Sequence, residues 1–257
     1  MNKQEFLEMK DEFALIIYNY EKFLKDCILL DYRYNDQFFE LLQKVRYYEV
    51  ENGLLATCLQ NRSQNPEFDT TKVLSDFKEG YSKELENAVQ KHKVAHSVVS
   101  HLNDNTPDEN KEFEKIYQDF IKENHPVVKA LVTDEEKELY EKLKIFYYEN
   151  NYKGFLEACE LNKDTFKEVE YPEDLFAKIS QYYYDIRKNI GADFTKRQKG
   201  YPFVKKDVFQ DDMTIAEEDA NLKTSYNKLL GDNKKLHQDY IKMFGSDITL
   251  NELVKQA

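Results

Sequence analysis

Two histidines one helical turn apart are the residues of this sequence whose spacing most directly suggests chemistry. His92 and His96 are four residues apart, and His101 follows them. Histidines at positions i and i+4 of a helix can ligate a divalent metal ion. However, the HExxH signature of zinc proteases does not occur, and His92 falls on the apolar side of its predicted helix. A metal-dependent enzyme using these histidines is therefore an alternative hypothesis, and our main prediction contains no metal site and no cofactor.

The cysteines and carboxylates give no catalytic pattern. Cys27, Cys58 and Cys159 are widely spaced and lack the neighbours of a catalytic cysteine. The first two border apolar stripes, where cysteine acts as a small core residue. With 49 Asp and Glu in the chain, pairs of carboxylates carry no information about acid–base chemistry. The glycines form no phosphate-binding loop, and we predict no catalytic residues and no enzymatic activity.

One basic cluster is a candidate binding site. Its basic side chains are interleaved with Phe194, Tyr201 and Phe203. The cluster consists of Lys196, Arg197, Lys199, Lys205 and Lys206. Such a set could bind an acidic protein, a phosphate or RNA. It could equally be a solvated loop whose charges pair with the acidic bulk of the chain, which is the commoner role of charged segments.

The composition favours a folded, helical protein. The chain has 257 residues, 33% of them charged, with only 7 Gly and 5 Pro, and few such breakers favour long helices. The formal net charge of -12 repels phosphate backbones, so nucleic-acid binding by the whole protein is not expected. Apolar runs such as residues 13–18 are too short to cross a bilayer, and the first residues contain acids where a signal peptide needs an apolar core. We therefore expect a cytoplasmic protein that does not contact membranes.

Apolar residues recur at alternating steps of three and four in four stretches, which predicts helices that pack along their length. The stretches are residues 6–30, 38–59, 81–99 and 222–243. Polar Asn52, His92 and Asn233 stand at seam positions. There they could fix the register of the helices, or they could lie where the seam is frayed or exposed.

Breaks and capping patterns divide the predicted helices. Residues 31–36 (DYRYND) and 61–69 (NRSQNPEFD) are predicted connections, and helices are predicted at about 173–191 and 212–244. The Ser/Thr-x-x-Glu pattern of a capping box occurs at four threonines, which are Thr106, Thr133, Thr214 and Thr249. We predict an all-α fold, a long coiled-coil hairpin or bundle with an inserted helical pair. Its parts are a long-helix region (1–103), a compact helical unit (104–165) and C-terminal helices packing back on the coil (166–257).

The stretch 113–150 contains the most specific local pattern. A helical run of apolar residues stops at His125 and Pro126, since proline disfavours helix at the residue before it. A second, capped helix is predicted from Thr133. The facing sides are formed by Phe113, Ile116, Tyr117, Phe120, Ile121, Leu139, Tyr140, Leu143, Phe146 and Tyr147. Two antiparallel helices with His-Pro at their connection are therefore expected.

This pattern resembles helices II and III of a J-domain, the module by which co-chaperones stimulate the ATPase of a heat-shock chaperone. Tyr117 stands at the position of the tyrosine in helix II, and the family's His-Pro-Asp loop reads His125-Pro126-Val127 here. The resemblance is strongest over about 45 residues. Elsewhere the layout is similar to bacterial proteins in which a J-like unit sits among long coiled-coil helices.

Two departures separate the chain from active J-domains. Val127 replaces the aspartate on which ATPase stimulation in that family depends. The first helix of the pair, which is positive in the family, carries Glu112, Glu114, Asp119 and Glu123 among three lysines, so complementarity to an acidic chaperone surface would be lost. The resemblance thus implies the fold and not the activity.

The sequence as a whole predicts a non-enzymatic protein–protein interaction or adaptor protein with a degenerate J-like module that does not stimulate a chaperone ATPase. Its candidate contact residues are His125, Pro126 and the basic cluster, although a histidine at a helix end can also simply cap carbonyl groups. The expected partner is a protein, with a heat-shock chaperone as one candidate, and the apolar seams allow a homo-oligomer. A functional co-chaperone is the second alternative, beside the metal-dependent enzyme.

Overall fold

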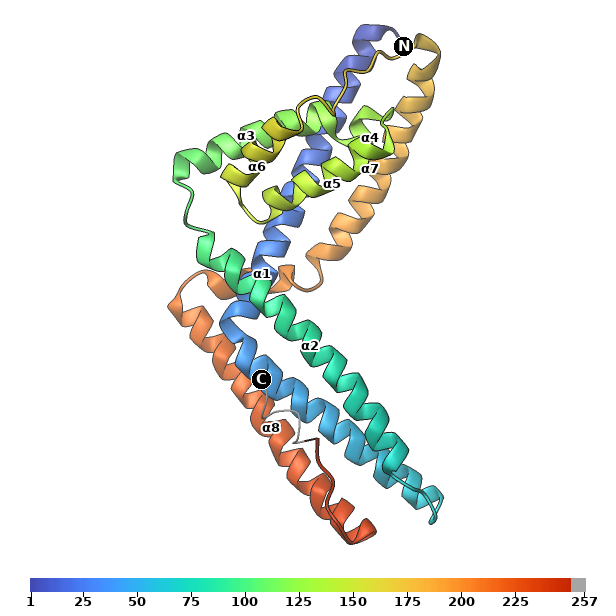
Figure 1. Ribbon diagram of the computed structural model, residues 1–257, viewed down its shortest axis with the longest axis vertical. Helices are drawn as coiled ribbons and strands as arrows, with labels where there is room; N and C mark the ends of the chain where they lie inside the picture. The colour runs from blue at the N-terminus through green and yellow to red at the C-terminus, as the bar shows by residue number, and fades with distance from the viewer. Residues whose placement is uncertain (251–257) are drawn as a thin grey trace. The chain divides into compact units, whose positions relative to one another are not determined.

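Helices make up all the regular secondary structure of the described chain. The computed structural model describes residues 1–250; 82% of these residues are helical and none of them forms a strand, so the predicted all-α class is confirmed. The helices are α1 (Lys3–Gln64), α2 (Thr71–His101), α3 (Pro107–Asn124), α4 (Pro126–Lys129), α5 (Asp134–Tyr148), α6 (Tyr152–Leu161), α7 (Phe176–Gln198) and α8 (Asp212–Phe244), with 3-10 helices η1 (Glu173–Leu175) and η2 (Phe203–Phe209) (Figure 1). Within these residues, no helix has the length and apolar character needed to span a bilayer.

The chain forms two compact units, each built from two separate stretches. Unit 1 contains residues 1–33 and 97–206, and unit 2 contains residues 34–96 together with the chain from residue 207. Helix α1 contributes its first half to unit 1 and its second half to unit 2. This grouping differs from the predicted boundaries at 103 and 165. The reason is that the first half of α1 packs on α3, α5, α6 and α7, whereas its second half packs on α2 and α8.

Helix α1 is continuous where the sequence suggested a break. Residues 31–36, predicted to separate two helices, lie inside α1, so that prediction was wrong. The stretch contains no glycine or proline, and Asp and Asn disfavour a helix interior only weakly. Tyr34 is buried, and its hydroxyl donates to Glu218 of α8. Tertiary packing therefore outweighs the weak local preference for a turn.

In unit 1 the first half of α1 and α7 run side by side in the same direction (Figure 1). Aromatic pairs with increasing residue numbers on both helices establish this. The pairs are Phe6 with Phe176, Phe13 with Tyr183 and Phe23 with Phe194, at ring-centroid distances of 4.5, 4.2 and 4.5 Å. These α1 residues belong to the predicted apolar stripe, so the stripe faces α7.

Helices α3 and α5 form the expected antiparallel pair. Phe113 near the start of α3 contacts Tyr147 near the end of α5, and Phe120 stacks on Tyr140. Both helices begin with the capping boxes that the sequence indicated. At each one, the threonine hydroxyl accepts the backbone N–H of the glutamate three residues later at 3.2 Å. These caps fix where the two helices start.

In unit 2 the second half of α1 lies between α2 and α8 (Figure 1). Helix α2 is antiparallel to α1 and α8 is parallel to it, as their contacts show. The contacts are Phe39 with His92, Tyr47 with Tyr81, Tyr34 with Glu218, and Tyr48 with Tyr226. Asn233 donates to Asn52 Oδ1 at 2.9 Å and to Glu51 at 3.0 Å. These two asparagines therefore take the register-fixing role that their seam positions allowed.

Helix α8 spans the predicted range 212–244, but its capping box differs from the predicted one. The Asp211 carboxylate accepts from the Thr214 backbone N–H at 2.8 Å, and the Thr214 hydroxyl accepts from the Asp211 N–H at 3.3 Å. The sequence had suggested Thr214 with Glu217. Aspartate is as good an N-cap as threonine, and it comes first in the chain. The box predicted for residues 249–252 extends beyond the described residues.

Two glycines of unit 1 provide a matched test of how closely α5 and α6 pack. A Cβ atom added at Gly154 would lie 2.8 Å from the Phe146 ring, whereas one at Gly191 of α7 meets nothing within 4 Å. Overpacking costs about 1–3 kcal/mol and alanine favours a helix over glycine by about 1 kcal/mol. We expect Gly154→Ala to lower the free energy of unfolding by about 1 kcal/mol and Gly191→Ala to raise it by up to about 1 kcal/mol. Urea titration followed by circular dichroism measures both, and equal effects would contradict the close α5–α6 contact.

Candidate functional site

A buried carboxylate on α1 joins three elements of unit 1. Glu21 is only 5% exposed and accepts the hydroxyl groups of Tyr117 on α3 at 2.5 Å and Tyr140 on α5 at 2.8 Å. The Nε2 atom of His125 lies 3.4 Å from the other carboxylate oxygen. The residue that the sequence placed at the tip of the J-like pair therefore faces the interior.

The contacts of His125 assign a role to each ring nitrogen. Its Nδ1 atom accepts the backbone N–H of Val127 at 3.1 Å, so Nε2 is the ring nitrogen that donates toward Glu21. Burial acts to raise the pKa of Glu21, but His125 and the two tyrosine hydroxyls outweigh it, and the pKa lies below its ordinary value. Burial and the nearby Glu21 carboxylate both raise the pKa values of Tyr117 and Tyr140. The cluster is therefore a carboxylate held ionised by three donors.

A second carboxylate, Glu114 of α3, makes the same kind of cluster beside the first. It accepts from Tyr18 at 2.6 Å and from Tyr147 at 2.9 Å, and the Lys25 ammonium lies 3.0 Å away. Burial acts to raise the pKa of Glu114, but the Tyr18 hydroxyl and Lys25 lower it to about 2. Burial also lowers the pKa of Lys25, against the attraction of Glu114. This pair is therefore an internal ion pair supported by two hydroxyls.

A buried ion pair joins α4 to α5. Lys129 is 3% exposed and its ammonium lies 2.5 Å from Glu136. Glu136 also accepts the backbone N–H groups of Thr133 at 2.8 Å and Lys167 at 3.2 Å. Burial opposes ionisation of Glu136, but Lys129 and these N–H groups lower its pKa to about 2. Glu136, the predicted capping residue of α5, thus also holds the segment after α6 through the Lys167 N–H.

The sequence reasoning missed Glu21, Lys25 and Glu114, because charged residues in a helix are usually placed in solvent. A signal was present in the spacing. Ala14, Tyr18, Glu21 and Lys25 follow steps of four, three and four, which makes a second stripe on α1 beside the apolar one. A charge on such a stripe indicates a buried partner.

The two predicted contact residues of the J-like connection are buried to different degrees. His125 is 8% exposed, whereas Pro126 is half-buried. His125 also packs edge-on against the Tyr140 ring, with centroids 4.7 Å apart. Its polar atoms thus point to internal partners.

The predicted basic cluster lies together at the end of unit 1. Three of its residues end α7 or follow it, and Lys205 and Lys206 belong to η2. All are exposed except Lys205, which is half-buried. Arg197 pairs with Asp193 at 2.5 Å, and the Lys206 ammonium lies 5.0 Å from the centre of the Phe203 ring. Four of the five basic side chains are therefore exposed, around the end of α7 and in η2.

The predicted histidine pair of α2 lies in unit 2. The His92 ring stacks on Phe39 with centroids 3.9 Å apart, and its buried Nδ1 atom has no hydrogen-bond partner. His96 Nδ1 lies 2.9 Å from the Asp36 carboxylate. Within residues 1–250, no group of three or more His, Cys, Asp or Glu side chains is placed to hold a metal ion.

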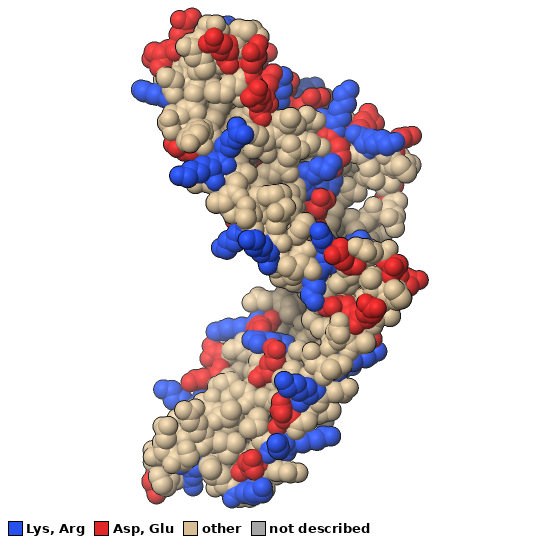
Figure 2. Space-filling model, turned by 180° about the vertical axis from the view of Figure 1, so that it is seen from behind, with Lys and Arg blue, Asp and Glu red and all other residues tan. Residues whose placement is uncertain are grey.

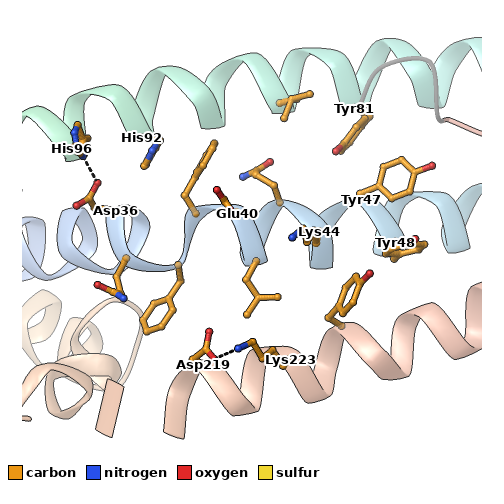
Figure 3. A pocket seen from close by; sticks show the side chains of 17 residues that line it. Asp36, Glu40, Lys44, Tyr47, Tyr48, Tyr81, His92, His96, Asp219 and Lys223 are labelled. Atoms are coloured by element: carbon orange, nitrogen blue, oxygen red, sulfur yellow. Dashed lines mark hydrogen bonds and ion pairs between the residues drawn. The ribbon is translucent and has the colours of Figure 1, made fainter. Parts of the chain in front are cut away.

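A trough of about 1100 Å³ runs along residues 36–48 of α1, with α2 on one side and α8 on the other (Figure 3). Figure 3 shows Asp219 and Lys223 of α8 on the side opposite the histidines, and Glu40 and Lys44 of α1 between them. The side chains of Asp219 and Lys223 form an ion pair at 2.5 Å. The trough is large enough for a segment of polypeptide.

Comparison with protein-family models, with curated proteins and with solved structures finds no match to this chain. Its function must therefore be inferred from its own residues.

The depressed pKa of Glu114 predicts a defined loss of stability in acid. A carboxylate with a lowered pKa in the folded state stabilises the fold above its unfolded pKa, and this contribution is lost as the pH falls through the folded pKa. We expect Glu114→Gln to lower the free energy of unfolding by about 2 kcal/mol at pH 7, after a discount for its partial exposure, and by almost nothing at about pH 2. Urea titrations between pH 7 and pH 2 measure the difference. Glu138→Gln, at an exposed site on α5, is the control, and a pH-independent effect of Glu114→Gln would contradict the cluster.

Proposed function

We propose that the protein is a non-enzymatic interaction or adaptor protein that binds an acidic protein partner through the outer side of α7 and η2. We call this the α7–η2 surface. It consists of Tyr184, Lys188, Lys196, Lys199, Tyr201, Val204 and Lys206. The observation that supports the proposal is the exposure of its aromatic and apolar side chains beside cations.

Three large side chains of this surface are exposed to solvent. Tyr184 is 66% exposed, Tyr201 52% and Val204 53%. Tyrosine beside basic residues is typical of interface surfaces, where the ring gives contact area and the cation selects an acidic partner. Tyr184 and Lys188 fall on one solvent-facing stripe of α7, and Lys199 directly follows the helix. A mixed aromatic and basic stripe suits the surface of a folded partner.

The basic cluster is a local feature of a chain whose net charge is -12. Figure 2 shows basic and acidic side chains interspersed on the face of each unit that it presents. An acidic partner would therefore be attracted by the α7–η2 surface itself, over roughly a Debye length of about 8 Å at physiological salt.

The buried polar clusters support the non-enzymatic part of the proposal. Glu21, Glu114 and Glu136 each use their oxygens on internal donors. An acid or base that acts on a substrate needs a position within hydrogen-bond reach of it. These groups instead hold helices together.

The co-chaperone alternative depends on the J-like pair. Two antiparallel helices with His-Pro between them support a J-like fold as part of the proposal. Burial of His125 against Glu21, together with valine at position 127, counts against ATPase stimulation. We therefore propose that the module is degenerate and structural.

Charge reversal on the α7–η2 surface tests the adaptor proposal. The surface variant is K196E/K199E/K206E, and the control variant of equal charge change is K115E/K142E/K228E. Immobilised full-length chain is used to capture proteins from lysate, with quantitative mass spectrometry as the readout. We expect proteins that are enriched by the wild type and by the control variant to be reduced about tenfold with the surface variant, because a few charge contacts of this kind are worth about 1.4 kcal/mol.

Equal capture by both variants would overturn this surface. Light scattering on the same samples separates capture of other proteins from self-association. A steady-state ATPase assay with a heat-shock chaperone tests the alternative. Acceleration that is abolished by His125→Gln would favour the co-chaperone over the adaptor.

A further inference from the structure

The chain turns back on itself after α8 (Figure 1). Phe244 ends this helix beside Arg62, whose guanidinium lies 5.3 Å from the centre of the phenyl ring. Six residues later, the backbone N–H of Leu250 donates to Glu51 at 3.2 Å. Arg62 and Glu51 are about 16 Å apart along α1 at 1.5 Å per residue. Residues 246–250, which we call the arm, therefore run back along α1 within unit 2.

Burial alternates along the arm, as it does in an extended segment. Ile248 and Leu250 are 8% and 0% exposed, whereas Asp247 and Thr249 are exposed. Successive side chains of an extended chain point to opposite sides, so the two aliphatic residues face the protein together. They share one buried apolar cluster with Leu54, Leu55 and Cys58 of α1 and Tyr240 of α8.

A buried carboxylate accepts hydrogen bonds from the arm. Glu51 is 3% exposed, and its Oε1 atom accepts the Thr249 hydroxyl at 3.0 Å and the Leu250 N–H at 3.2 Å. Tyr47 donates to the same carboxylate at 2.8 Å and Asn233 at 3.0 Å. The arm thus supplies two of these four hydrogen bonds. Loss of donors from a buried carboxylate is costly, so Glu51 without the arm needs a replacement hydroxyl and a replacement N–H.

A histidine of α8 binds the acidic side chain of the arm. His237 Nδ1 lies 2.6 Å from the Asp247 carboxylate, and the other ring nitrogen lies 3.7 Å from Glu51. The side chains that receive the arm form a surface that we call the Glu51 face, which consists of Glu51, Leu54, Leu55, Cys58, His237 and Tyr240. This face suits an extended chain with an acid, an aliphatic residue, a hydroxyl residue and a second aliphatic residue, in that order.

The arm is separate from the helices that form the Glu51 face. Gly245 ends α8 in the left-handed region, with φ of 76°, and residues 247–250 are not helical. A segment that buries two side chains and makes a few polar contacts opens at a lower free energy than a packed helix. The Glu51 face can therefore exchange the arm for another segment of the same pattern.

We propose that the Glu51 face is a recognition site for an extended segment of another protein, with the pattern acid–aliphatic–Ser/Thr–aliphatic, and that the arm covers it in the free chain. The partner's hydroxyl and the N–H of its second aliphatic residue donate to Glu51, and its acid pairs with His237. Because the arm belongs to the same chain, it competes at an effective concentration of about 1 mM, so a partner must present a matching segment to displace it. The site lies in unit 2 and does not depend on the α7–η2 surface of unit 1.

Peptide binding to the full chain tests this site. The probe is a fluorescein-labelled peptide of sequence SDITL, which copies residues 246–250, and the readout is fluorescence anisotropy. The released-arm variant is I248S/L250S, and the control variant I241S/M243S removes two exposed apolar side chains of α8. We expect the released-arm variant to bind the peptide about tenfold more tightly than the wild type and the control, because its own arm no longer competes. Equal affinities, or no binding to any of the three chains, would overturn the proposal.

Substitutions in the peptide test the recognition pattern without changing the protein. A peptide with Thr249→Val lacks the hydroxyl that donates to Glu51, and we expect the released-arm variant to bind it about fivefold more weakly. A peptide with Leu250→Asp is expected not to bind, since its aliphatic contact is lost. If the valine peptide binds as tightly as the parent peptide, the assigned role of Glu51 is wrong.

Hydrogen exchange in the wild-type chain keeps the test decisive if the released-arm variant folds poorly. An excess of unlabelled SDITL peptide is expected to speed exchange of the Leu250 N–H by about threefold and to leave the amides of α5 unchanged. An unchanged rate at Leu250 would contradict the proposal. A wild-type dimer in light scattering that is absent from the released-arm variant would also contradict it, because the segment would then come from a second copy of the chain.

Discussion

Carboxylates buried beneath tyrosine hydroxyls are the interaction on which the packing of this protein depends. Moving an ionised carboxylate out of water is costly unless donors replace the water, and removing one partner leaves that cost uncompensated. Glu21 meets this condition with one hydroxyl from α3 and one from α5, so both helices must arrive at the same point on α1. A shift of either helix along α1 would leave these buried polar groups without partners. The polar cluster therefore determines which register of the helices is stable.

Unit 2 uses the same principle with a different donor set. Glu51 is buried and accepts from a tyrosine, a threonine, an asparagine and a backbone N–H, which come from α1, α8 and the stretch after α8. Tyr34 and Glu218 repeat the tyrosine–carboxylate pairing between α1 and α8. Each unit thus combines aromatic surface, which supplies most of the burial, with a few acids that make the arrangement unique. This division of labour explains how four of the chain's 49 acids, Glu21, Glu51, Glu136 and Glu218, can be buried in the described structure.

The sequence predicted local features well and non-local ones poorly. Thr106 and Thr133 indicate the starts of α3 and α5, because a capping box is complete within four residues. The facing sides of α3 and α5 follow from spacing for the same reason. In contrast, the continuity of α1 through Tyr34 depends on Glu218, which is 184 positions away. The spacing of Glu21 on α1 indicates a second stripe, but its role appears only when Tyr117 and Tyr140 are placed around it.

The interleaving of the two units affects how the chain folds during synthesis. Each unit is assembled from two stretches separated by part of the other, in the order unit 1, unit 2, unit 1, unit 2. During synthesis, the first 96 residues would emerge from the ribosome with half of each core still missing its partner. Contacts between distant parts of a sequence form late, so apolar surface stays exposed until the partner segment has been made. The aromatic half of α1 is thus the surface most in need of protection in a nascent chain, and neither unit can be obtained by cutting the gene at a single point.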